Sequence, residues 1–390
     1  MMEPMQPPPS TATSGPPRVT VIGASLAGRA AALAAHRAGL PVTVLEQAPQ
    51  ASVPWGAVAL SPTAVAALDR LGVGVVRQSS SPIDALDFTH PDGRLIGRVP
   101  LAGAAAAAGA PLLLTPRDAL SSALSARLPP GAVRYSARIS GVQDGPDAAK
   151  VVINGAPAPA AVVVGADGLR SAVRQAILSD GPPRAVPVSI WAGWAPSQPS
   201  ALRRRALIVV GPHAHAIALP APRGRTWWLV GLPSQARVRD RFALQRALSG
   251  WAGPIKRLVS QTPGRSIRQA ALFDRPPSRL WGRGRITLAG DAAHPCAPHL
   301  GQGASMSLED AAALGEALAL HGATPAALRA YEAARQPVTA AIVGQAAWTA
   351  RTYSSRPAWI HLVNAGLGPT LRLAVPLLPA LVRAATRAVA

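Results

Sequence analysis

The stretch Arg285–Asp310 holds the residues of this chain whose types and spacing are best suited to chemistry. Its first residues, Arg285–Ala289, predict a short β-strand, and Gly290-Asp291 ends that strand with a carboxylate. Gly301-Gln302-Gly303 then opens a helix predicted from Ala304 to Leu320, whose bare N–H groups form an anion site. Such an arrangement suits one large anionic ligand, because Asp291 would hold a hydroxyl and the glycine turn would face developing negative charge.

A second motif lies near the start of the chain, where a strand, an Ala-rich helix and a strand are predicted over residues 18–46. This βαβ unit carries G-x-S-x-x-G at Gly23, Ser25 and Gly28, and Glu46 follows Gly28 by 18 residues. The glycines permit a tight turn and close approach to a pyrophosphate, and the acid would bind an adenosine ribose. Ser25 replaces the middle glycine, so its side chain either narrows the phosphate approach or donates to the phosphate itself.

A third candidate is an arginine on the apolar face of a helix. Pro116 starts this helix, and Arg117 shares one face with Leu120 and Leu124. A cation there needs an anionic partner. We interpret the partner as a cofactor phosphate, with a surface ion pair as the alternative.

Another acidic strand end occurs where the predicted strand Ala160–Gly165 leads into Asp167-Gly168 and then a helix. Open α/β sheets bind ligands at the carboxyl ends of their strands. Because Asp167 and Asp291 both follow strands, we predict that they lie at one ligand site although they are far apart in the chain.

The region between these two acidic motifs has a different pattern. Short strands replace helices, which predicts an inserted antiparallel sheet; the strands are Ala206–Val210, Ala214–Leu219 and Thr226–Leu232. Five tryptophans lie here, most of them expected in the core and one or two in a pocket wall. Trp227 and Trp228 are adjacent, so on a strand they face opposite sides. His213 and His215 would share a strand face, but no further ligands are found, and we expect no metal site.

Two less distinctive segments complete the interior of the chain. Ala102–Pro111 is interpreted as a low-complexity Ala/Gly loop, and Val133–Val142 with Lys150–Asn154 as the strands of a hairpin. Pro325–Ala347 is predicted to be mostly helical.

Composition narrows the class of protein. The chain has 390 residues, 49% of them hydrophobic, which is enough for two domains and a sizeable core. The net charge is +21, yet arginine runs are short and aromatic residues are not interleaved with them, so we expect no nucleic-acid partner. We attribute the charge to a genome that is biased toward arginine, with an acidic partner or substrate as the alternative. The single cysteine, Cys296, excludes an intrachain disulfide and fits a reducing compartment, so a cytoplasmic location is expected.

The two ends of the chain differ from the middle. Residues 1–17 are rich in proline, serine and threonine and predict a disordered tail. No stretch reaches the length of a transmembrane helix. The apolar tail Trp359–Ala390 either lies on a membrane surface as a peripheral contact or packs over the rest of the protein or in a dimer. The oligomeric state is left open.

Three motifs in this order resemble the FAD-dependent class A monooxygenases of the para-hydroxybenzoate hydroxylase type. They are GASLAG with Glu46, GADGLRSAVR at Gly165–Arg174, and GDAAHPCAPHLGQG at Gly290–Gly303. The resemblance covers about Arg18–Arg335. Ser305 stands where this family often has asparagine, and Thr63 stands where many members have asparagine after proline.

The resemblance implies a role for each matching residue. Glu46 would hold the adenosine ribose, Asp291 the ribityl or pyrophosphate region, and Asp167 lies in a motif linked to both FAD and NAD(P)H. Pro298 would lie beside the isoalloxazine, and Gly301–Gly303 at its pyrimidine edge. The implied catalytic set is Pro298, Gly301, Gln302 and Gly303; the implied cofactor-binding set is Gly23, Ser25, Leu26, Ala27, Gly28, Glu46, Gln47, Arg117, Asp167, Gly168, Gly290, Asp291, Gly301, Gly303, Ala304 and Ser305.

The fold implied is α/β, with a Rossmann-like FAD-binding domain, an inserted antiparallel β-sheet substrate domain and a helical C-terminus. We assign residues 18–75, 100–180 and 279–345 to the first domain, 76–99 and 181–278 to the second, and 346–390 to C-terminal helices.

The activity implied is NAD(P)H- and O2-dependent hydroxylation or epoxidation of a hydrophobic aromatic or polycyclic small molecule. By resemblance, reduced FAD forms a C4a-hydroperoxide whose distal oxygen is transferred, and NAD(P)H binds only transiently. The alternatives are a flavin-dependent halogenase, an isoprenoid-type reductase, or a non-catalytic basic flavoprotein. Trp191–Pro196, WAGWAP, does not match the halogenase motif, and Lys150 and Lys256 are the only lysines available for that chemistry.

Overall fold

The structure is a computed structural model that describes residues 18–211, 214–236 and 238–355. The predicted N-terminal tail and the apolar tail Trp359–Ala390 lie outside the described residues, as does His213. No described helix is long and apolar enough to cross a membrane.

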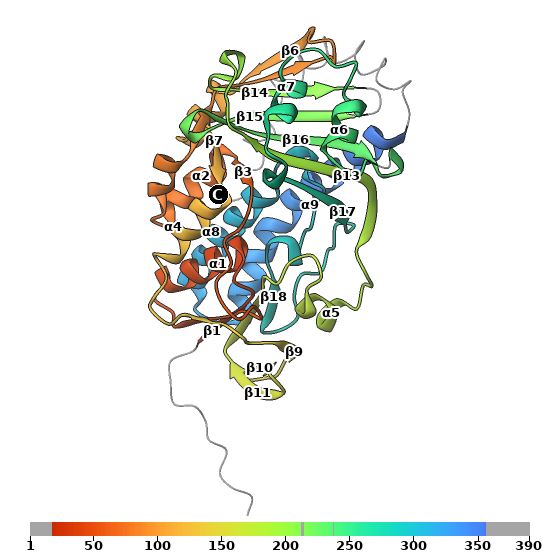
Figure 1. Ribbon diagram of the computed structural model, residues 1–390. Coiled ribbons are helices and arrows are strands. Elements are labelled where there is room, and N and C mark those ends of the chain that lie inside the picture. Colours follow the sequence, from red (N-terminus) through yellow and green to blue (C-terminus); the bar gives the residue numbers. More distant parts are fainter. Residues whose placement is uncertain (1–17, 212–213, 237, 356–390) are drawn as a thin grey trace, which may run out of the picture.

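One layer of the molecule is a five-stranded parallel sheet, of which Figure 1 labels β1 and β18. In spatial order its strands are β18 (Ile286–Leu288), β12 (Val162–Gly165), β1 (Val19–Ile22), β2 (Val42–Leu45) and β8 (Val133–Arg134). The first four are short, mostly apolar and buried, as in sheets covered on both faces, whereas β8 at the edge is partly exposed. The strands end in register, since Ile22 pairs with Leu45 on one side and with Gly165 on the other. The carboxyl ends of four strands therefore meet at one edge.

Helices cover this sheet. α1 (Leu26–Arg37) follows β1 and packs along α8 (Gly303–His321), which packs in turn on α9 (Pro325–Ser355). The two helices α1 and α8 approach closely at Gly315, where an added Cβ would lie 3.1 Å from the Ala34 Cβ. Close helix packing brings the N-termini of α1 and α8 to the same edge of the sheet.

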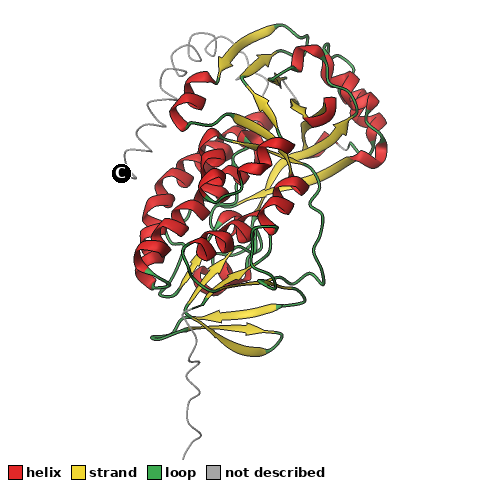
Figure 2. Cartoon of the chain, turned by 90° about the vertical axis from the view of Figure 1, so that its left-hand side faces the viewer, coloured by secondary structure: helices red, strands yellow, loops and turns green. Residues whose placement is uncertain are grey.

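A seven-stranded sheet forms the other large layer, at the opposite end of the molecule from the small sheet β9–β11 in both views (Figures 1 and 2). All its pairs are antiparallel except β14 with β5, which is parallel. Its strands in spatial order are β17 (Ile267–Asp274), β13 (Arg184–Ala195), β16 (Arg225–Pro233), β15 (His215–Ala221), β14 (Arg205–Val210), β5 (Ala85–Thr89) and β6 (Leu95–Pro100).

The two faces of this sheet have different partners. Trp228 is fully buried in the core that α6 (Arg241–Ala247) and α7 (Pro254–Gln261) complete. Trp227 points the other way, into the cluster shared with β7 and Ile83. The predicted opposition of these two side chains is confirmed.

Smaller elements connect the layers. One three-stranded sheet comprises β3 (Ala57–Leu60), β7 (Leu112–Pro116) and β4 (Ser81–Ile83), and a second comprises β9 (Ile139–Gln143), β10 (Ala149–Ile153) and β11 (Ala156–Ala160). The remaining α-helices of the described residues are α2 (Pro62–Arg70), α3 (Ala102–Ala108), α4 (Arg117–Ser125) and α5 (Ala172–Leu178).

Two local predictions were wrong. Ala102–Ala108 is a helix rather than a loop, because alanine has the highest helix propensity, and Gly109 ends it with φ 65°. Val133–Val142 is not one strand: Ser136 has φ 53°, and the chain turns there. Val133–Arg134 pairs with the parallel sheet, and only the later part joins β10.

Candidate active site

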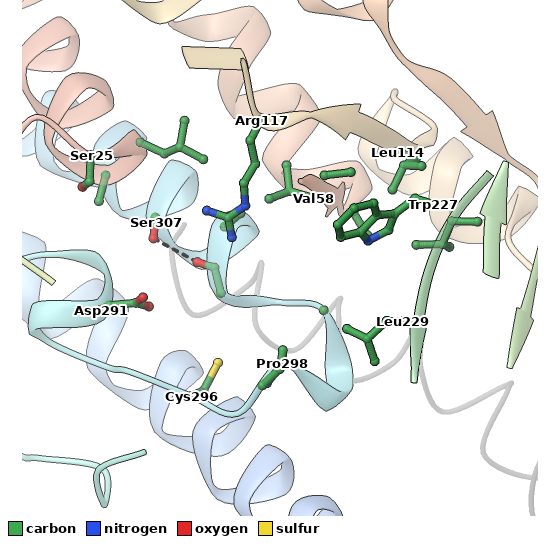
Figure 3. Close-up of a pocket in the computed structure, with 18 of the residues that line it drawn as sticks. Ser25, Val58, Leu114, Arg117, Trp227, Leu229, Asp291, Cys296, Pro298 and Ser307 are labelled. Carbon is green, nitrogen blue, oxygen red and sulfur yellow. Dashed lines mark hydrogen bonds between the residues drawn. The ribbon is translucent and has the colours of Figure 1, made fainter. Parts of the chain in front are cut away.

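A cavity of about 360 Å³ lies between the edge of the parallel sheet and the seven-stranded sheet (Figure 3). Its walls come from segments far apart in the chain: Ser25–Ala27, Ala57–Ala59, Leu114, Arg117, Ala166, Gly168, Ile217, Leu219, Trp227, Leu229, Asp291, Cys296, Pro298, Gly301, Gly303, Ala304 and Ser307. One side is polar and is formed by helix N-termini, while the other is apolar and is formed by strands.

The N-terminus of α1 is shaped by glycines at one side of the cavity. Gly23 has φ 98°, and a Cβ on it would lie 2.6 Å from the Ala166 carbonyl oxygen. A Cβ on Gly28 would lie 1.8 Å from the Gly23 carbonyl oxygen, so no side chain fits there. Ser25 caps the helix, since its Oγ accepts from the Gly28 N–H at 3.4 Å and donates to the Ala166 carbonyl. The hydroxyl thus organises the turn that a phosphate would meet.

Glu46 ends β2 beside this turn. Its carboxylate accepts hydrogen bonds from the Ala24 N–H at 2.7 Å and from the Ala48 N–H at 2.9 Å. Each oxygen keeps a free lone pair for a ligand hydroxyl. Gln47 is exposed next to it. Glu46 does not line the cavity itself. It lies beside the N-terminus of α1, where an adenosine ribose is expected.

The two aspartates at strand ends have different surroundings. The carboxylate of Asp167 accepts from the Ser171 hydroxyl and from the N–H groups of Ala172 and Val173, so it caps α5. The side chain of Asp291 points into the cavity (Figure 3). Asp291 is accessible from the cavity, but desolvation by the protein around the cavity raises the pKa of its carboxyl, while the charges of His294 and Arg117 oppose the rise.

The backbone that carries Asp291 is held from two sides by Arg174 and Asp310, which lie in the motifs quoted above but were given no role by the sequence. Arg174, which is 1% exposed, donates to the carbonyls of Ala292 and Ala293 at 2.9 and 2.8 Å. Asp310 accepts from the Gly290 N–H at 3.1 Å and contacts His294 Nε2 at 2.5 Å.

Asp310 also accepts from Arg335 Nε at 2.9 Å. Its neighbours His294 and Arg335 hold the pKa of the Asp310 carboxyl at about 2 despite burial. Sequence spacing gives no sign of this network, because its members come from a loop and two helices.

The start of α8 faces the cavity from the other side. Gly301 has φ 65° and makes the turn, Gln302 precedes the helix, and α8 begins at Gly303. No side chain caps this helix, so the N–H groups of its first turn are open to the cavity. Ser305 does not line the cavity; its hydroxyl accepts from the Ser61 N–H and donates to the Ala59 carbonyl, which joins α8 to β3.

Arg117 projects from the start of α4 into the cavity (Figure 3). Its guanidinium makes no hydrogen bond or salt bridge to any described residue. Desolvation lowers the pKa of Arg117, and the charge of Asp291 opposes this. The predicted surface ion pair is therefore not found among the described residues, and the cation is available to an anion in the cavity.

The apolar wall is supplied by the seven-stranded sheet and by β7. Ile217 and Leu219 alternate on β15, Trp227 and Leu229 alternate on β16, and Leu114 projects from β7. Alternation on a strand is the signal that could have found these residues. Trp227 also contacts Trp55 edge to face and Trp194 at a tilt, with ring centroids 5.0 and 4.8 Å apart.

Most of the predicted site residues are brought together here. Those that line the cavity are Ser25, Leu26, Ala27, Arg117, Gly168, Asp291, Pro298, Gly301, Gly303 and Ala304. The others lie behind it or beside it: Gly23, Gly28, Glu46, Gln47, Asp167, Gly290, Gln302 and Ser305. Among the described residues, no group of histidine, cysteine and acidic side chains could hold a metal ion.

A dinucleotide that extends along the edge of the sheet would fit these groups: the glycine-rich N-termini of two helices, the acids after the strands, and Arg117, which has no partner among the described residues. The apolar wall beyond them fits a ring system. Fold and site together define the class of α/β proteins that bind a flavin dinucleotide at the carboxyl edge of a parallel sheet.

The comparisons give the particular family. The FAD binding domain family matches residues 17–346, so the chain belongs to it. The aurachin C monooxygenase/isomerase of Stigmatella aurantiaca is 32% identical over 323 residues, which cover 81% of this chain and 84% of that protein. The 3-hydroxybenzoate 6-hydroxylase of Klebsiella oxytoca is 33% identical over 354 residues, covering 86% and 88%.

Among solved structures, HpxO of Klebsiella pneumoniae in complex with FAD and uric acid is similar, with a TM-score of 0.81 and 25% identity. The match covers 89% of this chain and 92% of that one. The protein is an FAD-dependent monooxygenase of the class A type, and it binds FAD.

Proposed function

We propose that this protein uses NAD(P)H and O2 to hydroxylate or epoxidise an apolar aromatic or polycyclic small molecule. The observation that carries the proposal is that groups suited to an anionic dinucleotide and a wall of Ile217, Leu219, Trp227 and Leu229 line the same cavity. An apolar ring bound against that wall would lie next to the part of the cavity framed by Pro298 and Gly303.

The chain's own residues have binding and orienting roles in this proposal. Glu46 holds the adenosine ribose, the α1 N-terminus and Arg117 bind the diphosphate, and Asp291 accepts a hydroxyl of the ribityl chain. Bound FAD supplies the redox chemistry, which takes electrons from NAD(P)H and activates O2. Arg174 and Asp310 act indirectly, because they hold the backbone of Asp291 in place.

The N-terminus of α8 has an electrostatic role. Its open N–H groups at Gly303 and Ala304 would face the pyrimidine edge of the cofactor, where negative charge develops on reduction. Donors fixed in advance in a site without water contribute most to rate. Loss of one would cost about 3 kcal/mol, or roughly 100-fold in rate.

The apolar wall orients the substrate and excludes water.

Within the lining of the cavity, Cys296 is an unsuitable base, because burial and the charges of Asp291 and Asp274 raise the pKa of its thiol to about 12. The thiol stays protonated at neutral pH. We assign no general base.

The halogenase alternative would need a lysine at the cavity, and neither lysine of the chain is there. Lys150 is exposed on β10, and Lys256 is exposed on α7, where its Nζ donates to the Ser249 carbonyl. Neither lines the cavity.

The deciding experiment starts from a screen of aromatic and polycyclic compounds for those that accelerate flavin reduction by NADH or NADPH. With an active compound and ¹⁸O-labelled O2, we expect one labelled oxygen atom in the product. Label that enters from water instead, or a product that forms only with chloride or bromide, would rule out the proposed reaction.

A further inference from the structure

Arg29 is a buried cation inside the first two turns of α1. Its side chain is only 6% exposed, and its Nη1 donates to the Ser121 hydroxyl on α4 at 2.6 Å. No described carboxylate pairs with it, and its Nε is enclosed without a hydrogen-bond partner. A buried charge that is met by one neutral hydroxyl is costly unless an anion completes the site.

The direction of the side chain indicates where that anion lies. Helical side chains lean toward the N-terminus, so Arg29 leans over the turn that contains Ser25 and Leu26, both of which line the cavity. Its partner Ser121 is four residues after Arg117, so the two share one face of α4. The contact with Ser121 therefore places the guanidinium of Arg29 between α1 and α4, on the face of α4 that carries Arg117; Arg29 itself is next to the residues that line the cavity and is not one of them.

One nitrogen of this guanidinium remains for a ligand. Nη1 donates to Ser121, and Nε is enclosed by protein. Nη2 makes no hydrogen bond to a described residue and is not fully enclosed. We infer that Arg29 is a second cationic ligand of the FAD diphosphate, which Nη2 contacts from the α1 side while Arg117 contacts it from the α4 side.

Electrostatics favour this assignment. A diphosphate diester carries a double negative charge, and the N-terminus of one helix supplies only about half a positive charge. Two guanidinium groups complete the neutralisation, and charge-assisted hydrogen bonds to phosphate are roughly twice as strong as neutral ones. The inference rests on FAD binding alone, so it stands or falls independently of the reaction proposed above.

The test measures FAD binding to the FAD-free protein by flavin fluorescence. Arg29→Met should raise the FAD dissociation constant by about 10- to 100-fold, the range for loss of a hydrogen bond to a charged group. ADP, which carries the diphosphate without the flavin, should lose affinity as a competitor, whereas adenosine should not. Arg37→Met on the exposed end of the same helix removes the same charge and should leave all three affinities unchanged.

The stability of the FAD-free protein distinguishes a cofactor-binding role of Arg29 from a purely structural one, in which it only connects α1 to α4. If Arg29 awaits an anion, Arg29→Met removes an uncompensated buried charge, and the unfolding temperature without FAD should stay the same or rise. An unchanged FAD dissociation constant together with a lower unfolding temperature would overturn the inference and leave Arg29 as a tie to Ser121. If Arg29→Met does not fold, Arg29→Gln is measured by the same two criteria.

Discussion

At the scale of single residues, identical side chains at equivalent strand ends serve different purposes. Asp167 and Asp291 follow the neighbouring strands β12 and β18, yet only Asp291 keeps its oxygens for a ligand. The oxygens of Asp167 are taken up by the first N–H groups of α5. The difference arises because a helix begins a few residues after Asp167, whereas the chain after Asp291 continues as a loop held by Arg174.

Arg117→Ala should weaken FAD binding and lower the unfolding temperature of the FAD-bound protein together. The guanidinium has no described protein partner, so its removal costs ligand interactions and few protein contacts. Free energy lost from ligand binding is lost from folding in the presence of the ligand. Thermal unfolding with and without FAD checks this. A larger loss of stability in the FAD-free protein would contradict the assignment.

Asp310→Asn should destabilise the protein by about 3–5 kcal/mol, because Arg335 loses a buried partner. Asp147→Asn, at an exposed site, is the matched control and should change stability by less than about 0.5 kcal/mol. Urea unfolding of both variants gives the comparison.

The same carboxylate makes stability depend on pH. Its pKa is about 2 in the folded protein and about 3.9 in an unfolded chain. Its contribution to stability is therefore complete above about pH 4 and is lost as the pH falls through about 2. In Asp310→Asn, acid unfolding should lose the part of its pH dependence that falls in this window.

At the scale of elements, the turn before α8 distinguishes two glycines that look alike in sequence. Gly301 has φ 65°, which other residues adopt only with strain, whereas Gly303 is helical. A Cβ on Gly303 would meet only Asp291 Oδ1 and Cys296 Sγ, both at 3.9 Å. The turn therefore depends on Gly301, and the space at Gly303 belongs to the cavity.

Gly301→Ala should lower the stability of the FAD-free protein by about 1–2 kcal/mol, the cost of a left-handed non-glycine residue. Gly303→Ala should leave that stability unchanged or raise it, since alanine favours helices. It should instead weaken FAD or slow its reduction, because the methyl group enters the cavity. Thermal unfolding and stopped-flow reduction of the two variants separate these effects, and equal loss of FAD-free stability would refute the distinction.

At the scale of the whole molecule, the cavity draws its walls from both large sheets. Trp55, just before β3, packs edge to face against Trp227 of β16, so the segment before β3 already touches the seven-stranded sheet beside the cavity. FAD bound there would contact segments from residue 25 to residue 307 and would stabilise all of them at once.

The unfolding temperature should therefore rise continuously with FAD concentration, in a single transition. At 100 times the dissociation constant the added stability is about 2.7 kcal/mol. Scanning calorimetry at several FAD concentrations measures it, and a lower transition that FAD does not move would indicate that part of the described structure unfolds without regard to the cofactor. Boundaries between the two parts remain a prediction that such data would refine.

The sequence by itself determined the chemistry-bearing motifs and the class of fold. Gly23, Gly28, Gly301 and the acids after apolar strands are local signals, because turn geometry and strand ends depend on neighbours in the chain. The strands β1, β2, β12 and β18 and the helices α1 and α8 follow from short-range patterns in the same way. The single strand predicted at Val133–Val142 failed because its turn at Ser136 carries no glycine or proline.

Only the tertiary structure decided which of these groups face the ligand and what supports them. Asp167 is used up by a local cap of α5, but the backbone around Asp291 is held by Arg174 and Asp310, which come from elements distant in the chain. The unmet charge of Arg29 likewise became visible only when α1 was packed on α4. Burial, pairing of charges and the shape of a cavity depend on residues distant in sequence, and no local pattern encodes them.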